Sequence, residues 1–250
     1  MARAAARRRS PKSRRGGLVS VFGSNFAAPG TAVVVQASDL QNGSLPTKLA
    51  NTCVQVGTAL GFLTFVGAGQ INFQVPDVPA GSTVNVQVVS NCGTTNEIRS
   101  ATVAVPVQSA TPEFLYWVRN ANGSNPIVAV NAATGSYVGA AGLIPGANFT
   151  PARPGDVLTI YCISLGPTNP AVPAGMPSTG AAQVTAAATV KIGSTTLDPA
   201  SVLYVGASPG TAGLYQLNIT VPALADGDYP LILTLDRYST PASGFITVKN

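Results

Sequence analysis

Residues 83–88 read Thr-Val-Asn-Val-Gln-Val and alternate strictly between polar and apolar side chains. Successive side chains of a β-strand point to opposite faces of the sheet, so the three valines share a buried face and the polar residues face water. The leucines in residues 231–235, Leu-Ile-Leu-Thr-Leu, mark a single inward face in the same way. No comparably long stretch has the period of a helix, so the pattern predicts an all-β protein.

Similar short runs recur along the chain, bounded by Gly, Pro and Asn at spacings typical of a β-sandwich. The predicted strands of the first half are 18–22, 31–36, 53–56, 62–65, 70–75, 83–89 and 102–107. Those of the second half are 127–130, 157–163, 187–192, 201–205, 215–221, 229–235 and 244–248.

The two halves repeat one pattern of strands. The matching segments are GGLVSVF (16–22) with GDVLTIY (155–161), VQVG (54–57) with VKIG (190–193), and QINFQVP (70–76) with QLNITVP (216–222). Their offsets of 139, 136 and 146 residues are nearly constant, which predicts two copies of one immunoglobulin-like sandwich rather than a solenoid of shorter period. We expect the first sandwich at 16–108 and the second at 109–250, the second including an extended segment that leads into it.

The basic residues are concentrated at the start of the chain. Seven of the 14 lie within residues 1–15, and from residue 16 onward 7 basic residues accompany 9 acidic ones. Clustered arginine is typical of nucleic-acid-binding or nuclear-localisation arms, but also of a solvated disordered tail or of sequence foreign to the natural chain. We expect a disordered basic head at 1–15 and no nucleic-acid partner.

Composition excludes most catalytic classes. Histidine is absent, so Ser-His-Asp hydrolysis, Cys-His proteolysis and His-containing zinc sites are all excluded. The nine acids offer no recognisable carboxylate pair for glycoside hydrolysis. Asp226 and Asp228 raise the question of calcium, but Asp-Gly-Asp between two strands favours a solvated hairpin turn. The sequence predicts a protein that is not an enzyme and has no metal or cofactor.

Three cysteines give one candidate disulfide. Cys53 opens one predicted strand and Cys92 follows the alternating run, so the two lie at the edges of neighbouring strands. A Cys53–Cys92 disulfide would indicate an oxidising compartment; two buried thiols are the alternative. Cys162, within VLTIYCIS, is expected to be a small buried residue.

The aromatic run at residues 114–117, Phe-Leu-Tyr-Trp, is the strongest candidate for binding. Trp117 and Tyr116 are side chains that stack on sugar rings or anchor protein partners. The structural alternative is that Phe114 and Tyr116 face the core or the junction between the sandwiches, while alternation leaves Trp117 partly exposed.

Several longer segments carry a family resemblance. They are SVFGSNFA (20–27), GQINFQVPDVPAG (69–81), NCGTTNEIRSATVAVPVQSATPEF (91–114), PARPGDVLTIYCISLGPTNPAVPAG (151–175) and LYVGASPGTAGLYQLNITVP (203–222). Together they resemble an uncharacterised C-terminal region of large secreted, mostly acidobacterial proteins, related to the IPT/TIG immunoglobulin-like folds. The resemblance spans roughly residues 16–250. It implies tandem sandwiches and an extracellular or cell-surface location, with no catalytic residues.

The start of the chain departs from this pattern. Members of the family have a further strand and a Pro-Gly turn before the segment matching Leu18, as the second copy has at 150–156. Here RRRSPKSRRGG (7–17) stands in that place. We therefore expect a truncated or mis-started reading frame and a first sandwich without its first strand. A missing edge strand exposes backbone donors and acceptors and invites association with another chain.

The sequence predicts a non-catalytic structural or adhesive module of a secreted or cell-surface protein. Its expected partner is an unidentified protein or polysaccharide at the cell surface. The alternative is a carbohydrate-binding module that uses exposed aromatic side chains. No apolar run approaches the ~20 residues of a membrane-spanning helix, so no membrane span is expected.

Overall fold

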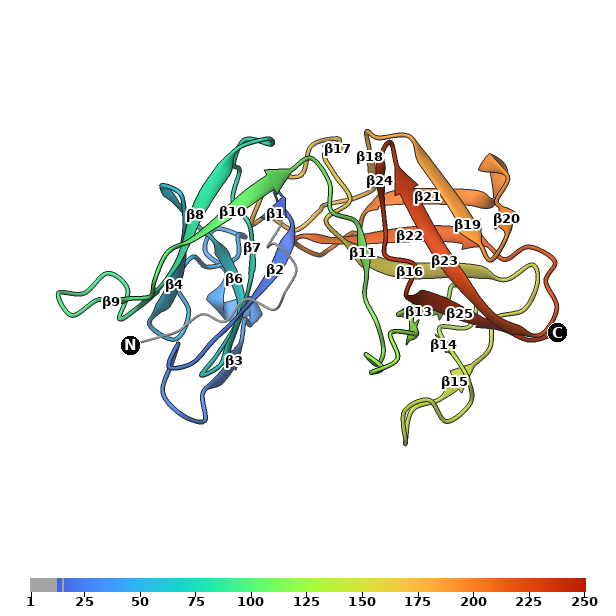
Figure 1. The fold of residues 1–250 in the computed structure, drawn as a ribbon, viewed down its shortest axis with the longest axis horizontal. Helices are drawn as coiled ribbons and strands as arrows, with labels where there is room; N and C mark the ends of the chain where they lie inside the picture. Colours follow the sequence, from blue (N-terminus) through green and yellow to red (C-terminus); the bar gives the residue numbers. More distant parts are fainter. Residues whose placement is uncertain (1–12, 15) are drawn as a thin grey trace. The chain divides into compact units, whose positions relative to one another are not determined.

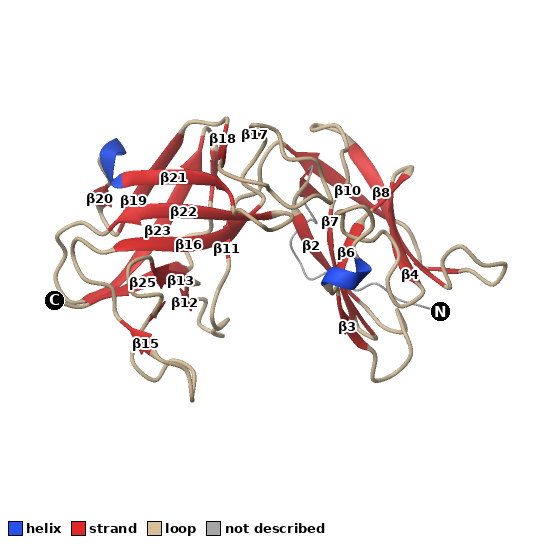
Figure 2. Ribbon diagram, turned by 180° about the vertical axis from the view of Figure 1, so that it is seen from behind, coloured by secondary structure: helices blue, strands red, loops and turns tan. Residues whose placement is uncertain are grey.

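The structure is a computed structural model that describes residues 13–14 and 16–250, and it is nearly all β (Figure 1). The predicted basic head therefore lies outside the described residues except for two positions, Ser13 and Arg14, which form strand β1. Two short 3-10 helices, η1 (Ala37–Asp39) and η2 (Pro199–Ser201), interrupt the strands (Figure 2). The described residues form tandem immunoglobulin-like β-sandwiches.

The chain divides into two compact units. Unit 1 contains the described residues up to Ser109 together with Ala171–Gly180 and Pro209–Gly213. Unit 2 contains Ala110–Pro170, Ala181–Ser208 and Leu214–Asn250. Two segments of the second half of the sequence thus belong to the first unit, whereas the sequence places everything after residue 108 in the second sandwich.

Unit 1 consists of two sheets. One has the order β1-β10-β8-β4-β5, with β9 added to β8, and the other has the order β2-β7-β6-β3. Their strands are β1 (Ser13–Arg14), β2 (Leu18–Phe22), β3 (Ala32–Val34), β4 (Thr52–Val56), β5 (Ala59–Leu60), β6 (Phe62–Gly67), β7 (Gln70–Gln74), β8 (Thr83–Ser90), β9 (Ile98–Arg99) and β10 (Val103–Gln108).

Unit 2 also consists of two sheets. One has the order β15-β14-β13-β16-β22-β21-β18-β17, with β11 added to β16, and the other has the order β12-β25-β23-β19-β20, with β24 added to β23. The first sheet is made of β11 (Glu113–Phe114), β13 (Ala129–Asn131), β14 (Tyr137–Val138), β15 (Phe149–Thr150), β16 (Val157–Ile163), β17 (Thr168–Asn169), β18 (Ala182–Val184), β21 (Val202–Ala207) and β22 (Leu214–Thr220). The second is made of β12 (Asn125–Pro126), β19 (Ala188–Ile192), β20 (Thr195–Thr196), β23 (Gly227–Leu235), β24 (Tyr238–Ser239) and β25 (Gly244–Val248).

The sheet topology carries the internal repeat of the sequence. In unit 1, β2 pairs with β7 and β4 with β8; in unit 2, β16 pairs with β22 and β19 with β23. Each of the three matched sequence segments lies on corresponding strands of the two units. A two-residue strand also runs parallel to the last strand of each sandwich, β1 beside β10 and β12 beside β25.

Each unit has its own hydrophobic core, built from the inward faces of its strands. In unit 2 the alternation of β16 places Leu158, Ile160 and Cys162 inside, each with no exposed surface. In unit 1 the matching interior is formed by residues such as Leu63 and Ile71, also fully buried. Burial of alternate apolar side chains from two facing sheets is what holds a sandwich together.

A buried glutamine connects Ala171–Gly180 to the rest of unit 1. Gln74, 4% exposed, donates from Nε2 to the Gly16 carbonyl at 2.9 Å and accepts from the Gly175 N–H at 2.8 Å. The Gly175 carbonyl in turn accepts from the Leu45 N–H at 2.8 Å. Because a buried amide is costly unless it is hydrogen-bonded, these bonds fix Ala171–Gly180 as part of unit 1.

Candidate functional site

The aromatic run predicted for binding lies in unit 2, at the end of β11. Three rings meet there: the Trp117 centroid lies 4.8 Å from that of Tyr137 and 5.1 Å from that of Phe149, and those two rings are 5.6 Å apart. The Trp117–Phe149 contact is edge-to-face, a favourable arrangement of aromatic quadrupoles. Tyr137 is 43% exposed whereas Phe149 is only 4% exposed. The cluster therefore has a buried base and a solvent-facing ring.

Backbone pairing sets the position of Trp117. The Trp117 N–H donates to the Pro126 carbonyl at 2.9 Å, and the Leu115 N–H donates to the Tyr161 carbonyl at 3.0 Å. The other two rings are brought together because β14 pairs with β15 through Tyr137 and Phe149. The Trp117 indole Nε1 is buried and has no hydrogen-bond partner, which leaves one polar group of the cluster unsatisfied.

Tyr116 does not join the three-ring cluster. It packs against the unit 2 core, as does the fully buried Phe114, so the two side chains lie where the alternation places them. The Arg119 guanidinium lies 5.0 Å from the Tyr116 ring centroid and pairs with Glu113 at 2.8 Å. Burial raises the pKa of the Tyr116 phenol, Glu113 adds to this, and Ser243 and Arg119 oppose it. Tyr116 is thus a partly buried residue that packs against the core, with a cation over its ring.

Two members of the cluster could not be found from the sequence. Tyr137 and Phe149 lie 20 and 32 residues after Trp117, on the two-residue strands β14 and β15. Such short strands carry no alternation, and only the long-range pairing of β13, β14 and β15 brings their rings to Trp117. The pair Tyr116 and Trp117 stays a prediction as a binding surface, and in the structure the ring that contacts Trp117 from the solvent side is that of Tyr137.

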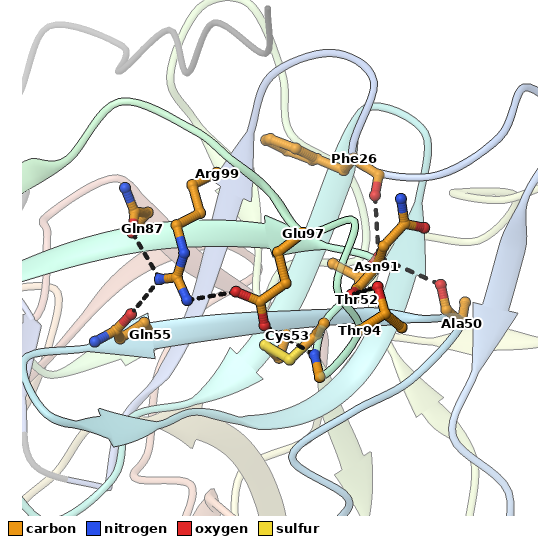
Figure 3. The surroundings of a disulfide bond; sticks show 12 residues. Phe26, Ala50, Thr52, Cys53, Gln55, Gln87, Asn91, Thr94, Glu97 and Arg99 are labelled. Carbon is orange, nitrogen blue, oxygen red and sulfur yellow. Dashed lines mark hydrogen bonds and ion pairs between the residues drawn. A yellow bond between two sulfur atoms is a disulfide. The ribbon is translucent and has the colours of Figure 1, made fainter.

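The disulfide candidate lies in unit 1. Cys53 on β4 is bonded to Cys92, which follows β8, with Cα atoms 5.9 Å apart (Figure 3). Both cysteines and Val89 form a small buried cluster. β4 and β8 are antiparallel neighbours in one sheet, so this disulfide cross-links the end of a strand pair within that sheet. The disulfide of antibody domains differs, because it joins the two sheets of the sandwich.

A polar network covers the sheet beside the disulfide. Arg99 on β9 donates from Nη1 to the side-chain oxygens of Gln55 at 2.9 Å and Gln87 at 3.2 Å, and from Nη2 to Glu97 at 2.6 Å (Figure 3). Glu97 also accepts from the Gly93 N–H at 2.9 Å. These bonds, the Gly93 contact first, lower the pKa of Glu97. The network ties the loop that carries Cys92 to strands β4 and β8.

The Cys162 thiol and the carboxylates of Asp226 and Asp228 have structural roles. Cys162 is a free, fully buried thiol whose pKa is raised by burial, which disfavours the reactive thiolate. Asp226 accepts from the backbone N–H of Asn250 at 2.9 Å and from its amide at 3.0 Å, and Asp228 accepts from Thr247 at 2.6 Å. Asp226 ends the bend before β23, and Asp228 belongs to that strand rather than to a turn. Within residues 13–14 and 16–250, no group of three or more His, Cys, Asp or Glu is arranged to hold a metal ion.

Comparison with known proteins yields structural neighbours only. No protein-family model matches the chain, and no curated protein sequence matches it. A search of solved structures finds the Bacteroides ovatus mixed-linkage glucan utilization protein SGBP-B, solved with a mixed-linkage heptasaccharide, at 12% identity and a TM-score of 0.39. It covers 98% of this chain, which spans only 45% of the length of that protein.

Two further neighbours are similar over nearly their whole length. Domains 5–6 of the S-layer protein SbsC share 11% identity at a TM-score of 0.31, covering 100% of this chain and 98% of that one. The tandem Ig repeats of Dlar share 10% identity at a TM-score of 0.22, covering 97% and 96%. No helix in the part of the chain that the structure describes is long and apolar enough to cross a membrane.

Proposed function

We propose that this chain is a non-catalytic structural or adhesive module of a secreted or cell-surface protein, of the IPT/TIG-related kind that its sequence resembles. The observation that carries the proposal is the Cys53–Cys92 disulfide in unit 1. Disulfides persist in oxidising compartments and are rare in the cytosol, so a structural cross-link inside a sandwich favours an exported protein. The mechanism is presentation: two sandwiches of low charge hold loops at their ends.

The test traps the thiols in cells that produce the protein naturally. Lysis in denaturant with a maleimide polymer should label one cysteine, Cys162, and reduction before labelling should raise the number to three. Antibody labelling of unopened cells should also detect the chain. Three reactive thiols before reduction, or protein recovered only from the cytosol, would contradict the proposal.

The second candidate is carbohydrate binding by the cluster of Trp117, Tyr137 and Phe149. The observation that favours it is the solvent-facing Tyr137 ring, 43% exposed, whose centroid lies 4.8 Å from that of Trp117 in a tilted contact. Aromatic rings bind sugar rings through their faces, so an exposed tyrosine ring that rests against a tryptophan offers a surface for a sugar.

Affinity electrophoresis through gels containing soluble polysaccharides tests this second candidate. Retardation of the natural chain should be lost in Tyr137→Ala, while Tyr238→Ala, which removes a tyrosine from the other sheet of unit 2, should migrate like the natural chain. Trp117 is the only tryptophan, so its fluorescence reports occupancy directly. Equal retardation of both variants, or no retardation by any polysaccharide, would exclude this site as the binding surface.

A further inference from the structure

Strand β2 of unit 1 lies at the edge of its sheet, whereas the corresponding strand of unit 2 does not. β16 pairs with β22 on one side and with β13 on the other. β2 pairs with β7, and among residues 13–14 and 16–250 no second strand pairs with it. In the described part of the chain, unit 1 therefore lacks the counterpart of β13.

The missing neighbour changes the burial of equivalent side chains. At the repeat offset of 139 residues, Val19 and Val21 correspond to Leu158 and Ile160. The unit 2 residues have no exposed surface, whereas both valines are partly exposed. Phe22, whose side chain lies on the opposite face of β2, is 55% exposed. The apolar face of β2 is thus less completely covered than the matching face of β16.

The backbone of β2 is also oriented for pairing. The Gly17 carbonyl accepts from the Val75 N–H at 2.9 Å and the Gly23 N–H donates to Gly69 at 3.0 Å, so the odd-numbered residues of β2 face β7. In an antiparallel ladder the intervening residues face the other way. The N–H and C=O groups of Leu18, Ser20 and Phe22 therefore line the outer edge.

Unit 2 shows how such an edge is occupied. The Tyr161 N–H donates to Val128 at 3.0 Å and the Val157 carbonyl accepts from Ala132 at 2.8 Å. Tyr161 and Val157 are the repeat counterparts of Phe22 and Leu18. The occupying segment presents small or β-branched residues to the core, including Ala129 with no exposed surface. An equivalent strand would fit β2 with the same hydrogen-bond pattern.

Nothing in the sequence of β2 opposes such pairing. Proteins protect edge strands with charged residues or proline, which prevent another strand from adding to the sheet. Residues 18–22, Leu-Val-Ser-Val-Phe, contain neither. β3, at the other edge of the same sheet, is only three residues long, a length that itself limits pairing.

We propose that the outer edge of β2 binds an extended, uncharged strand from a different protein, antiparallel to β2 and similar to the β13 segment in its alternation of small and β-branched residues. This goes beyond the proposed function, because it assigns a docking surface and the chemistry of its partner. Binding is by strand addition, in which backbone hydrogen bonds supply affinity and the side chains that reach Val19 and Val21 supply specificity.

The experiment uses a fluorescent peptide with the sequence of residues 125–133, Asn-Pro-Ile-Val-Ala-Val-Asn-Ala-Ala, added to the full chain. Fluorescence anisotropy should show saturable binding, and hydrogen exchange should slow at the Leu18, Ser20 and Phe22 amides. Ser20→Pro removes an outward backbone donor and should weaken binding about tenfold; it leaves the backbone bonds to β7 in place but also removes the 2.8 Å bond from Ser20 Oγ to Asn72 Oδ1. Ser20→Thr keeps the donor and should bind like the natural chain.

Modified peptides test the same point without changing the protein. Val130 pairs with Thr159 in the ladder, so its N–H faces β16, whereas the Ala129 N–H faces the opposite way. N-methylation at the position of Val130 should abolish binding. N-methylation at the position of Ala129 should change the Kd by no more than about threefold, which is a smaller effect than the loss of one hydrogen bond. Absence of saturable binding, protection confined to β16, or equal binding of both modified peptides would overturn the proposal. So would concentration-dependent dimerisation that Ser20→Pro abolishes, because the occupant would then be a second copy.

Discussion

The two units share one topology but are stabilised differently. The main core of unit 2 contains 22 buried apolar residues in the described chain, and that of unit 1 contains 12. Unit 1 has the disulfide, whereas at the offset of 136 residues Thr189 stands in unit 2 where Cys53 stands in unit 1. In the part of the chain that the structure describes, the unit with the smaller core and with no strand beyond β2 is thus the one with a covalent cross-link.

Within residues 13–14 and 16–250, unit 1 keeps the shared sandwich topology although no second strand pairs with β2. The retained strands β2, β7, β4 and β8 keep their pairing, so the central ladders of the two sheets are intact. What changes is the source of stability: buried apolar area in unit 2, and in unit 1 a smaller buried area plus a constraint on the unfolded chain. Mutations that act on each source separately should distinguish the units.

Removal of the disulfide should have the largest effect. The bond spans 39 residues, for which chain entropy gives a contribution of about 4 kcal/mol. Cys53→Ala combined with Cys92→Ala should lower the free energy of unfolding of unit 1 by this amount. The calorimetric transition of unit 1 should then move to a lower temperature. The transition followed by Trp117 fluorescence, which reports unit 2, should not move. Equal destabilisation of both transitions would show that the units do not unfold independently.

Matched truncations on β16 and β2 should differ in cost. Leu158→Ala removes a fully buried side chain and should cost unit 2 about 3 kcal/mol through lost burial and the resulting cavity. Val19→Ala removes a smaller, partly exposed side chain at the matching position and should cost unit 1 about 1 kcal/mol. Urea unfolding followed by circular dichroism and by Trp117 fluorescence measures both. A loss at Val19 as large as that at Leu158 would mean that the β2 edge is covered.

Gly175 tests whether Ala171–Gly180 stabilises unit 1. Its φ is +83°, and an added Cβ would approach the Phe62 ring to 2.5 Å and Ser44 to 2.6 Å. Gly175→Ala should therefore destabilise unit 1 by about 2 kcal/mol. Gly210 has a φ of +76° with open space around it, so Gly210→Ala should cost about 1 kcal/mol from backbone strain alone. Equal losses in the two variants, measured by urea unfolding, would contradict the close approach of Phe62 and Ser44 to Gly175.

The sequence predicts the long strands well because each has enough residues to show the alternation of more and less buried side chains. Leu18–Phe22, Val157–Ile163 and Gly244–Val248 begin and end where alternation and flanking turns place them. Two-residue strands such as β14 and β15 are not predictable in this way, because their pairing depends on distant neighbours and not on their own composition. The three-ring cluster is hidden from the sequence for the same reason.

The assignment of segments to units was equally inaccessible from the pattern. Pro- and Gly-rich residues such as 171–180 are typical of a surface loop, and nothing local indicates that Gly175 bonds to Gln74 across 101 positions. Gln74 itself lies in a strand whose alternation predicts only that it points away from the core. A polar side chain satisfied by sequence-distant backbone groups is visible only in three dimensions.

The smallest expected difference between the units is their response to acid. Glu97 in unit 1 and Asp226 in unit 2 have lowered pKa values, chiefly from backbone hydrogen bonds to Gly93 and Asn250. A carboxyl group whose pKa is lowered in the folded state stabilises that state at pH values above its ordinary pKa, which is 4.5 for Glu97 and 3.8 for Asp226. This stabilisation is lost as the pH falls through the folded-state pKa. The chain has no histidine, so both melting temperatures should be flat from about pH 8 to 5 and fall only below that. Calorimetry should show that the melting temperature falls less steeply with acid for unit 1 in Glu97→Gln and for unit 2 in Asp226→Asn. If the melting temperature of either unit instead changed most steeply near neutral pH, another group would control its stability.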